Sequence, residues 1–143
     1  KAEAGKRGAE IRDKILTNLR GFKELNEAIQ ERAKHGVITA IDGRPIRLLG
    51  KKFAALNYLL QSCGSAICKM WILRANVLLK EANIDYKPLA FIHDEMQLAV
   101  KKEQTEDAEF LIKAAMKDVQ TTLHFRCELD SDTKVGSNWS ETH

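Results

Sequence analysis

The sequence has 143 residues, of which 44% are apolar and 30% are charged, and its formal net charge is +3. This length suits one domain of ordinary size, and the apolar fraction excludes a disordered tail. The mild positive charge is compatible with a nucleic-acid partner but does not by itself indicate one. The longest uncharged apolar run, 53–68, is shorter than the ~20 residues of a membrane span, so no membrane partner is expected.

The cysteine pattern favours a reducing compartment. The three cysteines, Cys63, Cys68 and Cys127, are odd in number and lack CxxC spacing, so neither a disulfide framework nor a structural zinc site is expected. We find no signal peptide and no lipidation motif. Because the chain begins with Lys1 rather than Met, we expect it to be part of a longer polypeptide.

Residues 1–36 predict two helices. Apolar residues recur every three or four positions between Ile11 and Ala33, which is typical of a helix with one apolar face. Gly21 lies inside this pattern, and a glycine in a helix interior costs about 1 kcal/mol. We therefore expect a break between Thr17 and Gly21.

Residues 37–50 predict a β-hairpin. The β-forming run at 37–41 is followed by Asp42-Gly43, a strong two-residue turn sequence. Pro45 in the returning strand indicates an edge position, because proline cannot donate a hydrogen bond to a neighbouring strand.

Residues 51–82 predict a long helix that is apolar over most of its circumference and therefore largely buried. Some of that apolar surface would be exposed in an isolated chain, which favours aggregation or association. One narrow stripe is polar, with four-residue spacing that keeps its members on one face. It indicates either a polar partner or a few solvated side chains at a domain edge, and the pattern leaves both open. The stripe consists of Asn57, Gln61, Ser65 and Lys69, with Gly64 beside it.

Residues 89–100 predict a second hairpin after a loop at 83–88. Short apolar strands at 89–92 and 96–100 flank three titratable residues, His93, Asp94 and Glu95, which would lie at the hairpin tip.

The C-terminal part predicts a helix and a strand. Thr105 is expected to cap the helix, with acidic residues in its first turn. Residues 125–129 are expected to form a final strand, and Trp139 to anchor the C-terminus by packing. The predicted fold is α+β, a small antiparallel sheet with packed helices that include one long buried helix.

The hairpin tip is the strongest candidate for chemistry. Two adjacent carboxylates, Asp94 and Glu95, repel each other unless a cation lies nearby or one takes up a proton. Mg²⁺ bound to substrate phosphates needs only one or two such carboxylates, and a pair of ions can promote phosphoryl transfer. His93 could donate to a phosphate. The alternative is a charged, solvated turn. The remaining aspartates are typical turn residues, so a two-metal site from this chain alone would be incomplete.

Several segments resemble, in order, the C-terminal third of the polymerase domain of family A DNA polymerases, the DNA polymerase I family. They are FAALNYLLQSCGSAICK at 53–69, FIHDEMQ at 91–97 and KVGSNW at 134–139. LLQSCGSAICKMW, HDEMQ and HFRCELD are most similar to the phage replicative type. The hairpin GVITAIDGRPIRL is similar to the segment that follows the fingers. The resemblance runs from Gly8 to His143.

The resemblance implies roles for individual residues. Asp94 would be a ligand of the two magnesium ions, with Glu95 as the neighbouring acid of the metal site. His93 would contact the primer strand near its 3′ end. Asn57 and Gln61 would face the duplex near the primer terminus, where minor-groove acceptors can be read without sequence discrimination. Lys69 is a further candidate for contact with the DNA backbone.

The resemblance also implies a domain organisation for 1–143 as the C-terminal part of a polymerase palm. Residues 1–36 would be helices following the fingers, 37–50 a β-hairpin, 51–82 the long helix, and 89–143 the catalytic hairpin, a helix and a C-terminal strand. The family's first catalytic motif, fingers helix and thumb are not found in this sequence. The expected partners are therefore the remainder of the polymerase (fingers, thumb and first half of the palm), primer-template DNA and a dNTP.

The implied activity is template-directed nucleotidyl transfer in DNA replication, in the cytoplasm, or the host cytoplasm if the protein is phage-encoded. Because phosphoryl transfer depends on positioned charge and metal, the isolated chain is expected to be inactive. Two alternatives stay open, a non-catalytic fragment that binds duplex DNA and a small metal-dependent nuclease. Salt-dependent DNA binding that does not change with magnesium would indicate the DNA-binding fragment. Magnesium-dependent cleavage of DNA by the isolated chain would indicate the nuclease.

Overall fold

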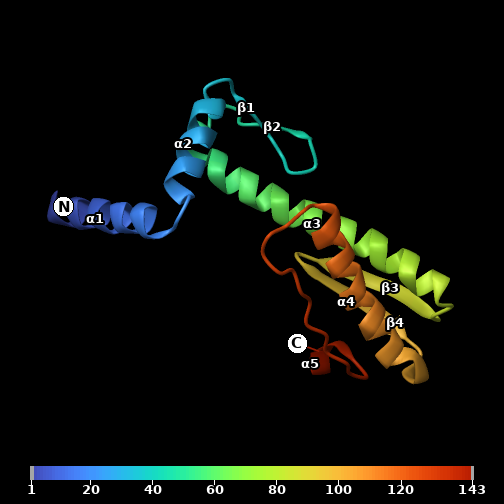
Figure 1. Ribbon diagram of the computed structural model, residues 1–143. Helices are drawn as coiled ribbons and strands as arrows, with labels where there is room; N and C mark the ends of the chain where they lie inside the picture. The colour runs from blue at the N-terminus through green and yellow to red at the C-terminus, as the bar shows by residue number, and fades with distance from the viewer. Residues whose placement is uncertain (1, 143) are drawn as a thin grey trace. The chain divides into compact units, whose positions relative to one another are not determined.

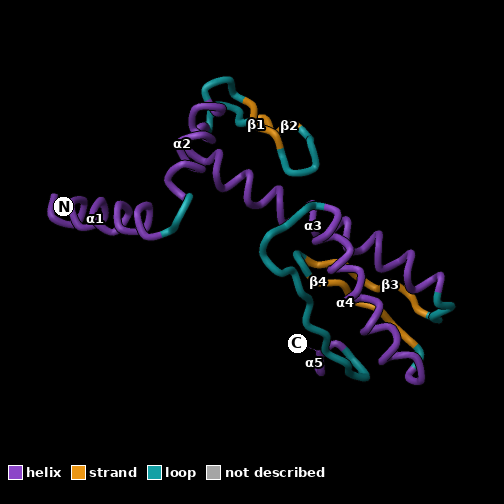
Figure 2. Tube along the Cα trace, viewed as in Figure 1, coloured by secondary structure: helices purple, strands orange, loops and turns teal. Residues whose placement is uncertain are grey.

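The computed structural model describes residues 2–142 (Figures 1 and 2). The chain divides into two compact units, 1–63 and 64–143, and each is described by itself. The long helix α3, Ala55–Glu81, contributes its first part to one unit and the rest to the other. None of the helices in the described residues is long and apolar enough to span a membrane.

The first unit begins with two helices, α1 (Ala2–Asn18) and α2 (Phe22–Ala33). The predicted break between them is confirmed. Gly21 has a φ of +80°, a left-handed conformation that interrupts an α-helix and that glycine adopts without steric cost.

The predicted hairpin after α2 is also confirmed. Strands β1 (Val37–Thr39) and β2 (Pro45–Arg47) pair antiparallel. Their turn is held by Asp42, whose carboxylate accepts hydrogen bonds from the backbone nitrogen of Arg44 at 3.2 Å and from its Nε at 2.6 Å.

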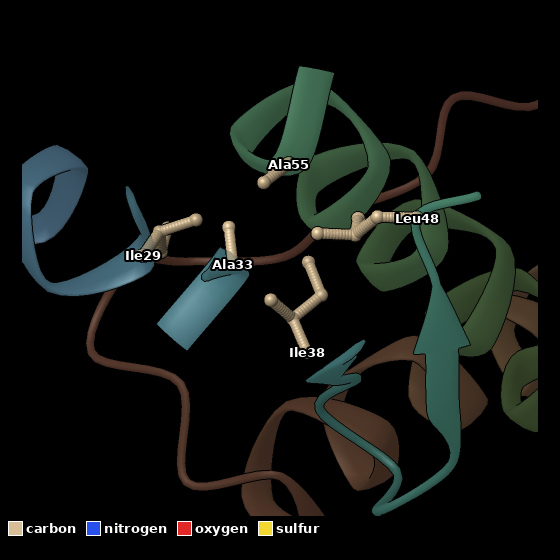
Figure 3. Packing of buried hydrophobic residues seen from close by; sticks show 5 residues of the cluster. All are labelled: Ile29, Ala33, Ile38, Leu48 and Ala55. Carbon is tan, nitrogen blue, oxygen red and sulfur yellow. The ribbon is translucent and has the colours of Figure 1, made fainter. Parts of the chain in front are cut away.

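A small core joins α2, the hairpin and the start of α3 (Figure 3). A 3-10 turn, Lys52–Ala54, leads into α3. Burying these side chains removes apolar surface from water, which stabilises the unit. The buried members of the cluster are Ile29, Ala33, Ile38, Leu48 and Ala55.

In the second unit, strands β3 (Tyr86–Ile92) and β4 (Glu95–Val100) form an antiparallel hairpin. The second predicted hairpin is therefore confirmed, but β3 starts earlier than expected. The loop predicted for 83–88 was wrong in its second half, because Tyr86 pairs with Val100 across the ladder. A register shift between Pro88 and Ala90 marks a bulge, an irregularity that proline in a strand favours.

Helices α3 and α4 (Thr105–Thr122) pack against this hairpin around two apolar clusters. The indole Nε1 of Trp71 donates a hydrogen bond of 2.9 Å to the backbone oxygen of Ile112, and Nε of Arg74 lies 2.6 Å from Oδ2 of Asp118. These two contacts tie α3 to α4. The predicted α+β class is confirmed, and the described residues form two separate two-stranded sheets in place of one.

Burial of α3 is confined to some of its positions. Trp71, Ala75 and Leu79 are buried, whereas Leu73 is 67% exposed and Val77 is 42% exposed. The exposed pair lines an open groove of about 670 Å³ between α3 and α4. Apolar surface of α3 is thus accessible in this structure, as predicted for the isolated chain.

Two expectations for the C-terminal part were wrong. Gln104 rather than Thr105 is the N-cap of α4, because the Thr105 hydroxyl donates back into the preceding 3-10 turn, Lys102–Gln104. Residues 125–129 form no strand, and the backbone nitrogen of Leu129 donates instead to Oε1 of Gln120 at 2.7 Å. Trp139 begins the short helix α5 (Trp139–Thr142) and is 54% exposed, so its anchoring role stays a prediction.

Candidate functional site

His93 and Asp94 lie at the tip of the β3–β4 hairpin, as the sequence predicts, whereas Glu95, expected between the strands, is the first residue of β4. Ile92 and Glu95 are the last paired residues, so His93 and Asp94 form the two-residue connection. Both connecting residues are exposed. His93 has a φ of +55°, which is strained for a residue other than glycine and is a conformation concentrated at functional sites.

The hairpin has one apolar and one mixed face. Met96 and Leu98 pack into the clusters with α3 and α4. Because side chains alternate along a strand, Glu95 and Gln97 project from the opposite face. On that face Nε2 of Gln97 donates a hydrogen bond of 2.7 Å to Oε1 of Glu95. Packing on one side thus fixes the strand that presents the carboxylate on the other.

The tip lies close to α3. Partial burial raises the pKa of the Cys68 thiol, and the negative charge of Asp94 raises it further. A charge acts on a titrating group in this way only over a short distance. The exposed carboxylate of Asp94 therefore acts electrostatically on Cys68, which lies near the middle of α3.

The carboxylate oxygens at the tip are ligands of the type that a hard cation prefers. Carboxylate oxygens are the ligands that Mg²⁺ prefers, and one or two of them suffice when waters and substrate phosphates complete the coordination sphere. Asp94 and Glu95 are two such carboxylates, adjacent in sequence at the tip. Within 2–142, however, no group of three or more His, Cys, Asp or Glu residues could enclose a metal ion. The tip is thus compatible with part of a metal site, with other ligands supplied from elsewhere.

The predicted polar stripe of α3 is exposed along its whole length. Asn57 and Gln61 lie in the first unit, and Ser65 and Lys69 lie in the second. All four side chains are exposed, so they are available to a polar partner. The structure brings His93, Asp94 and Glu95 together at one tip, and it places Asn57 and Gln61 in the other unit.

Two neighbours of the site were not predicted. Gln97 follows Glu95 by two residues in a strand, and that spacing alone could have indicated contact on one face. Cys68 gave no comparable indication, because its proximity to Asp94 arises from packing between segments far apart in the sequence.

Comparison with known proteins identifies the class of fold first. The structure matches the POL domain of Pol1 from M. smegmatis, solved as a complex with DNA primer-template and dNTP, with a TM-score of 0.70 and 21% identity. That match covers 79% of this chain and 22% of the solved one. At this identity the likeness shows a shared fold.

Sequence comparison then gives the family. The DNA-directed DNA polymerases of Enterobacteria phage T3 and Escherichia phage T7 are 35% and 34% identical to this chain, and each match covers 98% of it. The sequence model of DNA polymerase family A matches residues 6–141 of this chain. The chain belongs to DNA polymerase family A, as its sequence segments indicated. It spans 23% of the length of these two relatives.

Proposed function

We propose that this chain is the C-terminal palm segment of a DNA-directed DNA polymerase in DNA replication. Family membership over residues 6–141 supports this proposal. The observation on which it chiefly depends is the acidic tip of the β3–β4 hairpin. In the complete enzyme the segment contributes one metal-binding carboxylate motif and contacts to primer-template DNA. The remaining ligands and the contacts to the incoming dNTP come from the remainder of the polymerase.

The proposed reaction is attack of the primer 3′-hydroxyl on the α-phosphate of a dNTP, with release of pyrophosphate. Asp94 and Glu95 hold Mg²⁺, and His93 contacts the primer strand near its 3′ end. Bound magnesium supplies positive charge that stabilises the phosphates and favours ionisation of the attacking hydroxyl. The sharply turned tip supports these roles, because Asp94 is exposed there and the half-buried Glu95 lies on the strand face opposite the apolar packing.

The helix stripe is proposed to hold the duplex. Asn57 and Gln61 are exposed amides with both donors and acceptors. Every base pair presents acceptors in its minor groove, so such amides can bind duplex DNA without reading its sequence. Lys69 adds a positive charge for the phosphate backbone.

The carboxylate role is tested with Asp94→Ala in the polymerase that contains this segment. We expect loss of primer extension with primer-template binding retained. Asp107→Ala is the matched control, because Asp107 is an exposed aspartate in the first turn of α4. Normal extension by Asp94→Ala would refute the proposed function.

The binding role is tested separately with the double variant Asn57→Ala, Gln61→Ala. We expect weaker primer-template binding, measured as a higher dissociation constant at fixed salt, because salt concentration changes protein–DNA affinity. Asp94→Ala measured alongside separates binding from chemistry. An unchanged dissociation constant in the double variant would remove the stripe from the proposed interface.

A further inference from the structure

Glu95 is held by a hydrogen bond from its own strand. Nε2 of Gln97 donates to Oε1 of Glu95 at 2.7 Å, and both side chains are half-buried. A hydrogen bond to an ionised acceptor is shorter and stronger than one between neutral groups. Since a carboxylate only accepts hydrogen bonds, the amide nitrogen rather than the amide oxygen of Gln97 faces it.

The backbone beneath this pair is fixed by packing. Met96 lies between the two residues in sequence and packs with the cluster around Trp71, while Leu98 packs with the cluster around Leu79. Ala90 lies opposite Gln97 in the ladder, and its methyl group offers the amide no competing hydrogen bond. The amide and the carboxylate are therefore held on one face of a strand that cannot readily rotate.

The chemistry of the donor matters. A lysine or arginine at position 97 would orient the carboxylate but would also neutralise it. Glutamine donates a hydrogen bond and carries no charge. Gln97 thereby orients Glu95 without adding a charge of its own.

We propose that Gln97 is a positioning residue that sets the orientation of the Glu95 carboxylate toward the metal. This inference rests on the proposed function. Residues that hydrogen-bond a ligand orient it, and their removal typically costs about 10- to 100-fold in metal affinity or activity. Gln97 acts through Glu95 and is not itself expected to contact metal or DNA.

The test uses Gln97→Leu in the polymerase that contains this segment, with Gln97→Met as a second variant that keeps the length of the side chain but has no amide donor. Gln104→Leu is the matched control. The Gln104 amide also holds the hairpin, but at its other end, where its oxygen accepts a hydrogen bond of 2.9 Å from the backbone nitrogen of Asp85. Thermal unfolding shows whether each variant is folded.

Two readouts separate positioning from structure. The first is steady-state extension, with kcat and the KM for primer-template measured separately. The second is direct binding of Mn²⁺, measured by electron paramagnetic resonance in a complex with a dideoxy-terminated primer-template and dNTP, in which no turnover occurs. Both Gln97 variants are expected to lower kcat and weaken Mn²⁺ binding about tenfold or more, with the KM for primer-template unchanged. Gln104→Leu is expected to lower the unfolding temperature and leave both readouts within about twofold, since it removes two hydrogen bonds remote from the tip.

The outcomes are distinguishable. Wild-type kcat and Mn²⁺ affinity in folded Gln97 variants would overturn the positioning role, as would equal losses in Gln97→Leu and Gln104→Leu that follow the loss of stability. If Asp94→Ala is inactive while the Gln97 variants behave like wild type, only this inference fails. If Asp94→Ala extends primers normally, the proposed function fails.

Discussion

The thiol of Cys68 in α3 and the carboxylate of Asp94 at the hairpin tip lie within electrostatic range of each other. Burial raises the pKa of Cys68, and the charge of Asp94 raises it further. The same helix that packs against the hairpin through Trp71 therefore runs beside its acidic tip. This proximity can be measured without any enzymatic assay.

We expect Cys68 to react slowly with iodoacetamide near pH 8, because the thiolate is the nucleophile and a raised pKa reduces its population. Asp94→Asn removes one of the two causes of the raised pKa, so it should move the alkylation profile of Cys68 to lower pH. Cys127, which is exposed, is the internal reference in site-resolved mass spectrometry. An unchanged Cys68 profile, or an equal change at Cys127, would contradict the proximity.

His93→Gly should stabilise the protein and impair extension. The φ of +55° at His93 costs a residue other than glycine about 1 kcal/mol, and glycine adopts it freely. We expect a higher denaturation midpoint together with weaker extension, since the imidazole is proposed to contact the primer strand. Gain of stability without loss of extension would show that the imidazole has no such role.

Trp71→Phe should destabilise the second unit by about 1–2 kcal/mol, because it removes a buried hydrogen-bond donor and part of a buried ring. The indole is 6% exposed and donates to Ile112 at 2.9 Å. Urea denaturation followed by circular dichroism measures the change. Trp139→Phe is the control. Because Trp139 is 54% exposed, the urea midpoint of this variant should stay near that of the wild type.

Gly64→Ala should raise helix stability by about 0.5–1 kcal/mol, because alanine replaces glycine in the interior of α3. No atom outside its immediate neighbourhood lies within 4 Å of where the new methyl group would be, so the fold accommodates it. The methyl group would, however, lie beside the polar stripe, and we expect weaker primer-template binding.

The control for that measurement is Gly8→Ala in α1, where a methyl group also meets no atom within 4 Å. It should stabilise its helix without changing DNA affinity. Equal DNA affinity in Gly64→Ala and wild type would show that the duplex does not approach the helix at this position.

Features set by neighbouring residues could be predicted from the sequence. Gly21 interrupts the first helical pattern, Asp42-Gly43 reverses the first hairpin, and alternating apolar residues place His93 and Asp94 at the tip of the second. Each depends on backbone preferences over a few residues. The family could also be identified from the sequence, because each of its motifs is a short continuous segment and the segments occur in the expected order.

Features set by distant contacts required the tertiary structure. The segment 125–129 has strand-forming residues, yet the backbone nitrogen of Leu129 donates a hydrogen bond to the side chain of Gln120. A strand forms only where a second strand lies alongside it, and the local sequence does not show whether one does. Trp139 is apolar yet 54% exposed, because burial depends on which surfaces meet. The local sequence therefore determined where the acidic tip forms, and only packing decided that the charge of Asp94 acts on Cys68 in α3.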